Sequence, residues 1–209
     1  MALRMAARRL ASSGRAFALA CALGTAAGTA SAQTQPEPSA PAPARAQACA
    51  TCHGTPERSP QVRTPSLAGQ QRDFLELQMF LFREGLRDVP QMAGMFKGVS
   101  DTELVVMAKY FASQKTLSPP AGKPDPKLHA RGASLSASIG CGSCHMSDYR
   151  GQNQVPRIAN QREDYLVTAL KDYRDNRRSG TDTSMNSVLY QVSDADIQAL
   201  AHYLAHYSR

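Results

Sequence analysis

The chain has 209 residues, of which 42% are hydrophobic, five are cysteine and 24 are basic, and its formal net charge is +7. Four of the 24 basic residues lie in the first 32 residues, so 20 basic and 17 acidic residues remain beyond that segment, a net charge of +3. The remaining charges form no basic stripe, so nucleic acid is excluded as an expected partner.

Residues 1–32 have the pattern of a secretory signal peptide. The segment contains four arginines and no acidic residue, and residues 16–27 are apolar. This run is too short to span a bilayer comfortably, although an uncleaved membrane anchor is the alternative. Ala30-Ser31-Ala32 is a cleavage site of the A-x-A type. We therefore expect export to the periplasm, with cleavage after Ala32.

A proline- and alanine-rich leader at residues 33–44 precedes the first of two identical motifs. Cys49-Ala50-Thr51-Cys52-His53 and Cys141-Gly142-Ser143-Cys144-His145 both have the form C-x-x-C-H. This spacing is typical of covalent c-type haem attachment, in which both thiols form thioether bonds and the histidine binds the iron. Half a zinc site or a redox dithiol is the alternative for one copy. Two copies favour two covalently attached haems.

The elements after each motif follow the same order. The first segment, residues 45–114, has apolar spacing typical of a helix over 72–86. A loop containing Met92 and Met95 follows, and Ser100 to Glu103 forms a capping box that opens a helix to residue 114. Residues 115–125 are a linker in which prolines prevent regular structure.

The second segment, residues 126–209, repeats the first. We expect helices over 126–138 and 162–176, then Met185 in a loop, and then a last helix capped by Ser193. Corresponding residues of the two segments lie 91–93 positions apart, as His53 and His145 do. A period of this length indicates a tandem duplication. The expected fold is all-α, with two small helical domains that each enclose one haem.

A low-spin haem used for electron transfer needs a sixth ligand, which is usually methionine or histidine. His53 is the only histidine of the first segment, so a second histidine ligand is excluded there. Met79 and Met107 occur at helical core spacings. Met92 and Met95 lie in the loop, and Met92 precedes Ser100 by eight residues.

The same register occurs in the second segment, where Met185 precedes Ser193 by eight residues. We therefore predict Met92 and Met185 as iron ligands, and Met95 as part of the pocket wall. Met146 adjoins the motif and cannot reach the opposite haem face. Three histidines are alternative ligands for the second iron: His129, His202 and His206. His202 and His206 are expected to face solvent.

Two prolines complete the candidate sites. Pro65 and Pro156 occupy corresponding positions after the two motifs. A proline carbonyl beside the iron-bound histidine can accept a hydrogen bond from the imidazole ring, which fixes the ring and increases its basicity. We predict this role for both prolines.

The sequence resembles the cytochrome c4 family of di-haem cytochromes. Besides the two C-x-x-C-H motifs, the resemblance rests on Pro65-Ser66-Leu67-Ala68-Gly69-Gln70, Met92-Ala93-Gly94-Met95, Ser100-Asp101 and Tyr110-Phe111-Ala112-Ser113-Gln114-Lys115. It implies two class I cytochrome c domains related by a pseudo-twofold axis, with the haem propionate edges meeting. It also implies that the first methionine of M-x-G-M, here Met92, is the axial ligand.

The chain departs from the family before the first motif. The family has a glycine-containing helix there, which Gly132 preserves in the second segment and which alanine and proline replace in the first. We therefore expect the first domain to be more exposed or less stable.

The resemblance implies an electron-transfer protein and not an enzyme. The expected partners are redox proteins, namely a membrane terminal oxidase or a quinol-oxidising complex, with peripheral membrane association left open. A cytochrome subunit of a periplasmic dehydrogenase is the alternative. A di-haem peroxidase is less favoured, because it needs an open haem site and both segments offer a methionine.

Overall fold

The structure, a computed structural model, describes residues 43–208 except 55–57, 93 and 179–182. The predicted signal peptide and most of the predicted leader lie outside the described residues. Within the described residues the regular structure is helical, apart from one isolated bridge between Gln152 and Val155. All of the described residues belong to one compact unit.

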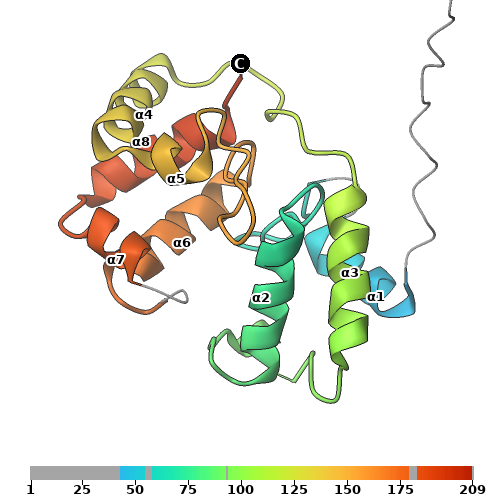
Figure 1. The fold of residues 1–209 in the computed structure, drawn as a ribbon. Coiled ribbons are helices and arrows are strands. Elements are labelled where there is room, and N and C mark those ends of the chain that lie inside the picture. Colours follow the sequence, from blue (N-terminus) through green and yellow to red (C-terminus); the bar gives the residue numbers. More distant parts are fainter. Residues whose placement is uncertain (1–42, 55–57, 93, 179–182, 209) are drawn as a thin grey trace, which may run out of the picture. The chain divides into compact units, whose positions relative to one another are not determined.

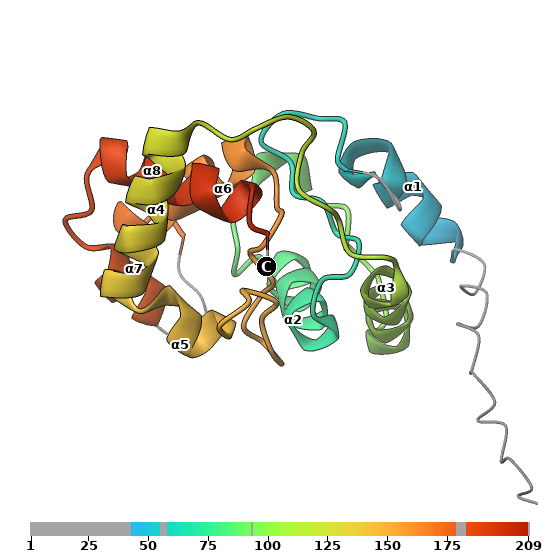
Figure 2. The ribbon, with the colours of Figure 1, turned by 90° about the horizontal axis from the view of Figure 1, so that it is seen from above.

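The first repeat consists of three α-helices and a short 3-10 helix (Figure 1): α1 (Ala44–His53), α2 (Arg72–Arg83), η1 (Pro90–Met92) and α3 (Asp101–Ser113). Helices α2 and α3 pack side by side, as Figures 1 and 2 show, and α1 contacts α3. Their apolar faces form one core that includes Leu75, Met107 and Phe111. The capping box opens α3, because Ser100 and Glu103 each bind the backbone N–H of the other.

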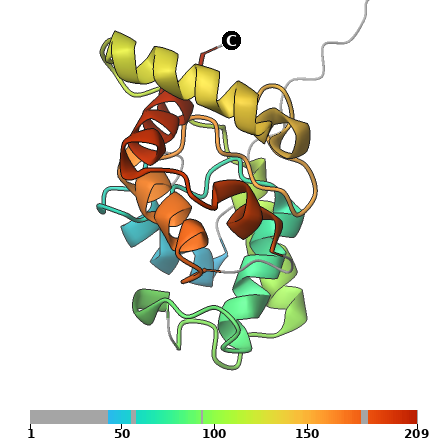
Figure 3. The same cartoon turned by 90° about the vertical axis from the view of Figure 1, so that its left-hand side faces the viewer.

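The described part of the second repeat contains five helices: α4 (Pro126–Ile139), α5 (Cys141–His145), α6 (Glu163–Arg174), α7 (Ser184–Leu189) and α8 (Asp194–Ala205). Helix α4 crosses α8, as seen in Figure 3, and α6 packs against both α7 and α8. Ser193 caps α8 by accepting a hydrogen bond from the Asp196 N–H. The expectation of a loop at Met185 is wrong, because this residue lies in α7.

Helices α2 and α6 end earlier than their apolar patterns predict, because the same turn closes both. Gly85 (φ 68°) and Asn176 (φ 55°) adopt the left-handed conformation that glycine and asparagine tolerate best. Beyond each turn the backbone folds back, so that the Leu86 N–H binds the Leu81 carbonyl at 2.8 Å and the Arg177 N–H binds the Asp172 carbonyl at 2.8 Å.

Gly132 allows α4 and α8 to approach closely. A Cβ atom at this position would overlap the carbonyl oxygen of Ala199 and lie 2.5 Å from the Cβ of Tyr203. The first repeat lacks a counterpart of this crossing within the described residues, since α1 begins only at Ala44, five residues before Cys49. Its lower stability remains a prediction.

Gly132→Ala is expected to destabilise the second repeat. The added methyl group must displace the backbone of α8, and overpacking of this kind costs about 1–3 kcal/mol. Thermal unfolding of the holoprotein, followed by circular dichroism, measures the effect. Ser134→Ala, at an exposed position of the same helix, is the matched control. Equal unfolding temperatures for the two variants would contradict the close crossing.

Candidate haem sites

Both C-x-x-C-H motifs are helical and end in a turn with positive φ. The first occupies the last turns of α1 and the second forms α5. The next residues, Gly54 (φ 67°) and Met146 (φ 68°), turn the chain away after each histidine. All four motif cysteines are free. Burial raises the pKa of the Cys49 and Cys141 thiols, whereas redox dithiols and zinc sites need a readily formed thiolate.

Each motif histidine is buried and hydrogen-bonded to a proline carbonyl. His53 Nδ1 lies 2.7 Å from the Pro65 oxygen, and His145 Nδ1 lies 2.8 Å from the Pro156 oxygen. A carbonyl only accepts, so Nδ1 donates in both cases and Nε2 keeps its lone pair. Burial lowers the pKa of both histidines, and the proline hydrogen bond opposes this shift only in part. The result is the neutral tautomer that an iron ligand requires.

Different local contacts hold the two prolines in place. In the first repeat, the Ser59 hydroxyl donates to the Cys52 carbonyl at 2.7 Å, while the Ser59 N–H donates to the Ser66 hydroxyl at 2.8 Å. In the second, the Gly151 N–H donates to the His145 carbonyl at 2.9 Å. A side chain at Gly151 (φ 74°) would overlap the Pro156 backbone, so this tight loop requires glycine.

The loop methionines of the first repeat differ in their surroundings. Met92 is partly buried and packs against the same core as Cys49, whereas Met95 is 50% exposed. The exposure of Met95 differs from the expected place in a pocket wall. Met79 and Met107 are buried core residues, 8% and 3% exposed. The packing therefore favours Met92 over the other three as the methionine available to a haem held by Cys49.

In the second repeat, α7 is fixed to the end of α6 by the residue after Met185. The Asn186 amide donates to the Tyr173 carbonyl at 2.7 Å and to the Arg178 carbonyl at 2.9 Å. Met185 itself is partly buried. Helix α7, which carries Met185, is therefore held in place by the C-terminal turn of α6.

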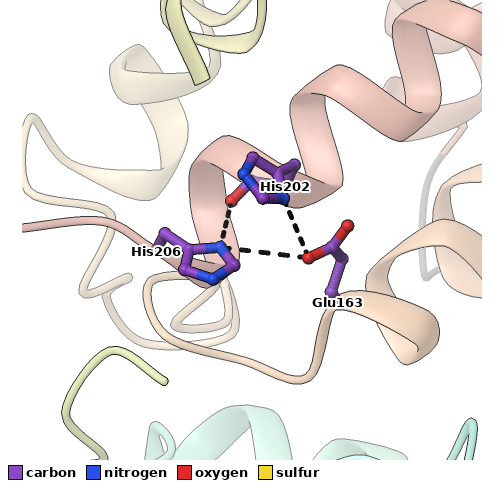
Figure 4. Close-up of side chains that lie close together, drawn as sticks. All are labelled: Glu163, His202 and His206. Carbon is purple, nitrogen blue, oxygen red and sulfur yellow. Dashed lines mark hydrogen bonds and ion pairs between the residues drawn. The ribbon is translucent and has the colours of Figure 1, made fainter. Parts of the chain in front are cut away.

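The expectation that His202 and His206 face solvent is wrong. His202 is 8% exposed, and Figure 4 shows both imidazoles beside Glu163. His202 Nδ1 donates to Glu163 Oε2 at 3.0 Å, and His206 Nδ1 donates to the His202 carbonyl at 3.0 Å. Residues from α6 and from the end of the linker cover this side of α8, which the pattern of α8 alone could not show.

Glu163, His202 and His206 lie close enough to suggest a metal site, but the hydrogen bonds argue against one. The Asp125 N–H donates to His202 Nε2 at 2.9 Å, which requires the imidazole proton to be on Nδ1. A metal on Nδ1 would move that proton to Nε2, where it would face the Asp125 N–H. We therefore regard the cluster as structural and His202 as unavailable to a haem.

His129 packs edge-to-face on Tyr203, with ring centroids 5.1 Å apart.

Two arginines that sequence analysis did not single out fit the acidic edge of a haem. Arg87 and Arg178 correspond to each other in the two repeats, and each guanidinium stacks over an aromatic ring of its own repeat, Phe82 or Tyr173, at 4.7 Å. Both also donate to the side-chain amide oxygen Oε1 of Gln78, at 2.6 and 3.4 Å.

The Nε atom of each of these arginines is buried and lacks a hydrogen-bond partner in the described part of the chain. Burial and the neighbouring Arg178 lower the pKa of Arg87. A buried Nε–H donor of a cationic group that lacks a partner favours an anion beside it, since an unsatisfied buried polar group is costly. The propionates of a c-type haem are such anions, so these residues fit the group. The recurrence of arginine 91 residues apart was the sequence signal for this pair.

Comparison with known proteins agrees with this site. The cytochrome c family model matches residues 129–208. Cytochrome c4 of Pseudomonas aeruginosa is 33% identical over 167 residues, which cover 75% of this chain and 82% of that protein. The thiosulfate dehydrogenase electron acceptor of Thiomonas intermedia is 30% identical over 172 residues, covering 76% of this chain and 77% of that protein.

Among solved structures, reduced recombinant cytochrome c4 from Pseudomonas stutzeri matches with a TM-score of 0.69 and 30% identity, over 80% of this chain and 98% of that one. The fold and the paired motifs together define a di-haem c-type cytochrome, an electron carrier and not an enzyme. The chain belongs to the cytochrome c4 family.

Proposed function

We propose that the protein is a periplasmic carrier that passes single electrons through two haems, each bound by one histidine and one methionine. His53 and Met92 would bind the first iron, and His145 and Met185 the second. Cys49, Cys52, Cys141 and Cys144 would hold the porphyrins. We further propose residues 45–114 and 126–209 as the two haem domains. Each haem would supply a one-electron ferric–ferrous couple.

The observation that carries this proposal is the same histidine arrangement in both repeats. In each, a buried neutral imidazole donates from Nδ1 to a proline carbonyl and leaves Nε2 for the iron. The hydrogen bond increases the basicity of the histidine, and a methionine on the opposite face favours the ferrous state and raises the potential. Cys49 and Cys141 are partly buried against the apolar cores of their repeats, so each motif begins beside apolar side chains.

The proposed periplasmic location rests on the predicted signal peptide, residues 1–32, and on the haem motifs. Among the helices that the structure describes, none is long and apolar enough to cross a membrane. The proposed partners are redox proteins, with a quinol-oxidising complex as donor and a membrane terminal oxidase as acceptor. Two relatives named as thiosulfate dehydrogenase electron acceptors favour a second candidate, in which a periplasmic dehydrogenase is the donor.

A rate experiment with the holoprotein separates these roles. The reduced protein is mixed with oxidase-containing membranes, and the oxidised protein with a thiosulfate dehydrogenase and thiosulfate, while the haem absorbance is followed. Oxidation by membranes that cyanide blocks supports delivery to a terminal oxidase. Rapid reduction that depends on both enzyme and thiosulfate supports the second candidate. If neither mixture changes the haem absorbance, the proposed carrier role between these partners is wrong.

A further inference from the structure

Two buried glutamines form reciprocal hydrogen bonds between the repeats. Gln161 accepts from the Ser66 N–H at 2.9 Å and donates to the Ser66 carbonyl at 2.9 Å. Gln70 accepts from the Arg157 N–H at 2.7 Å and donates to the Arg157 carbonyl at 3.0 Å. Each amide thus binds both backbone groups of one residue in the other repeat. Both glutamines are 7% exposed.

Each glutamine is also fixed from its own repeat. Gln70 Oε1 accepts from the Gln71 N–H at 2.8 Å, and Gln161 Oε1 accepts from the Arg162 N–H at 2.9 Å. With these bonds the amide oxygens and nitrogens have defined orientations, because backbone N–H groups only donate and backbone carbonyls only accept. The two side chains are therefore rigid connections between the repeats.

The residues they bind directly follow the two prolines whose carbonyls bind the candidate iron ligands. Ser66 follows Pro65, so its N–H and the Pro65 carbonyl belong to one planar peptide group. Gln161 holds the N–H side of this peptide, while His53 donates to its carbonyl side at 2.7 Å. Arg157 and Pro156 form the equivalent peptide, held by Gln70 on one side and bound by His145 on the other.

We infer that Gln161 is a positioning residue for His53, and Gln70 for His145. A glutamine of each repeat thus fixes the hydrogen bond that orients the iron-bound histidine of the other repeat. Binding of the peptide N–H fixes the plane of the carbonyl and polarises it, which makes it a stronger acceptor for the imidazole N–H. A stronger acceptor makes the histidine more basic and lowers the potential of its haem. This inference rests on the axial roles proposed above for His53 and His145.

The test uses the holoproteins of Gln161→Ala and Gln70→Ala. A matched control is Gln71→Ala, because Gln71 also donates across the repeats, to the Arg150 carbonyl at 2.8 Å and to the Gly151 carbonyl at 3.2 Å, but its side chain makes no hydrogen bond to either prolyl peptide among the described residues. Reduction potentials are measured by spectroelectrochemical titration. Solvent exchange of the two histidine Nδ1 protons is measured by NMR on reduced protein labelled with ¹⁵N-histidine, which assigns each effect to one haem.

The expected pattern is crossed. Gln161→Ala should raise the potential of the haem on His53 and speed exchange of the His53 Nδ1 proton, while the other haem changes less. Gln70→Ala should do the same to the haem on His145, and Gln71→Ala should change neither. Effects confined to the haem of the mutated repeat, equal effects on both haems, the same effects in the control, or no effect would each overturn the inference.

Variants with side chains of similar length separate a merely structural effect of the substitution from the loss of the hydrogen bonds. If an alanine variant does not retain both haems, Gln161→Met and Gln70→Met remove the hydrogen bonds while preserving side-chain size, and the same crossed pattern is required of them. Failure of the axial assignment shows differently: the wild-type protein would then lack Nδ1 proton signals shifted by the haem rings. Normal wild-type signals without the crossed pattern would contradict only the coupling between repeats.

Discussion

Cys52→Ala combined with Cys144→Ala will leave the mature protein without haem and largely unfolded. Each domain has only roughly 70–90 residues, and a domain of this size without its large apolar cofactor cannot bury enough surface to offset chain entropy. The structure supports this expectation, because among the described residues the first core has nine buried side chains, supplied mainly by α2 and α3. Circular dichroism and intact mass measure the result.

The control for this prediction changes the variable positions of the motifs. Thr51→Ala and Ser143→Ala retain both cysteines and the histidine, and both positions are exposed. These variants should keep two haem additions and full helicity. A haem-free double cysteine variant with wild-type helicity would show that the protein cores are sufficient by themselves.

The second large effect is expected at the sixth ligand. Met92→His should keep the first haem low-spin and lower its potential by on the order of a few tenths of a volt, within the roughly 0.8 V that axial ligands span. Met92→Leu should instead give a high-spin haem. Met185→His and Met185→Leu should have the same effects on the second haem. Absorbance spectra and redox titration measure these changes.

Met95→Leu is the matched control, because Met95 is 50% exposed whereas Met92 packs against the same core as Cys49. It should leave the spin state and the potential of the first haem close to the wild-type values. A high-spin haem in Met95→Leu together with a low-spin haem in Met92→Leu would show that the shared register of Met92 and Met185 does not identify the ligand.

The hydrogen bonds between the repeats connect the supports of the two candidate iron-bound histidines. The contacts that join the repeats around Gln70 and Gln161 involve the same loops that carry Pro65 and Pro156. A change in the contact between repeats therefore reaches the supports of both candidate iron ligands. Two separate domains on a flexible linker would have no such connection.

Local features were determined by the sequence itself. The C-x-x-C-H spacing fixes the identity of the cofactor, because attachment needs only neighbouring residues. The caps at Ser100 and Ser193 likewise depend on residues three positions away. Repetition at 91–93 residues predicted two similar helical units, and the family comparison confirmed the di-haem fold.

The tertiary structure determined those features that depend on contacts between residues distant in the chain. His202 is buried because Glu163 and Asp125 reach it from other segments, so the pattern of α8 could not reveal its hydrogen bonds. Gln70 and Gln161 recur in the sequence, but only folding shows that they bind residues 87 and 95 positions away. A side chain's periodicity reports its face of a helix, whereas its partners are set by how distant segments pack.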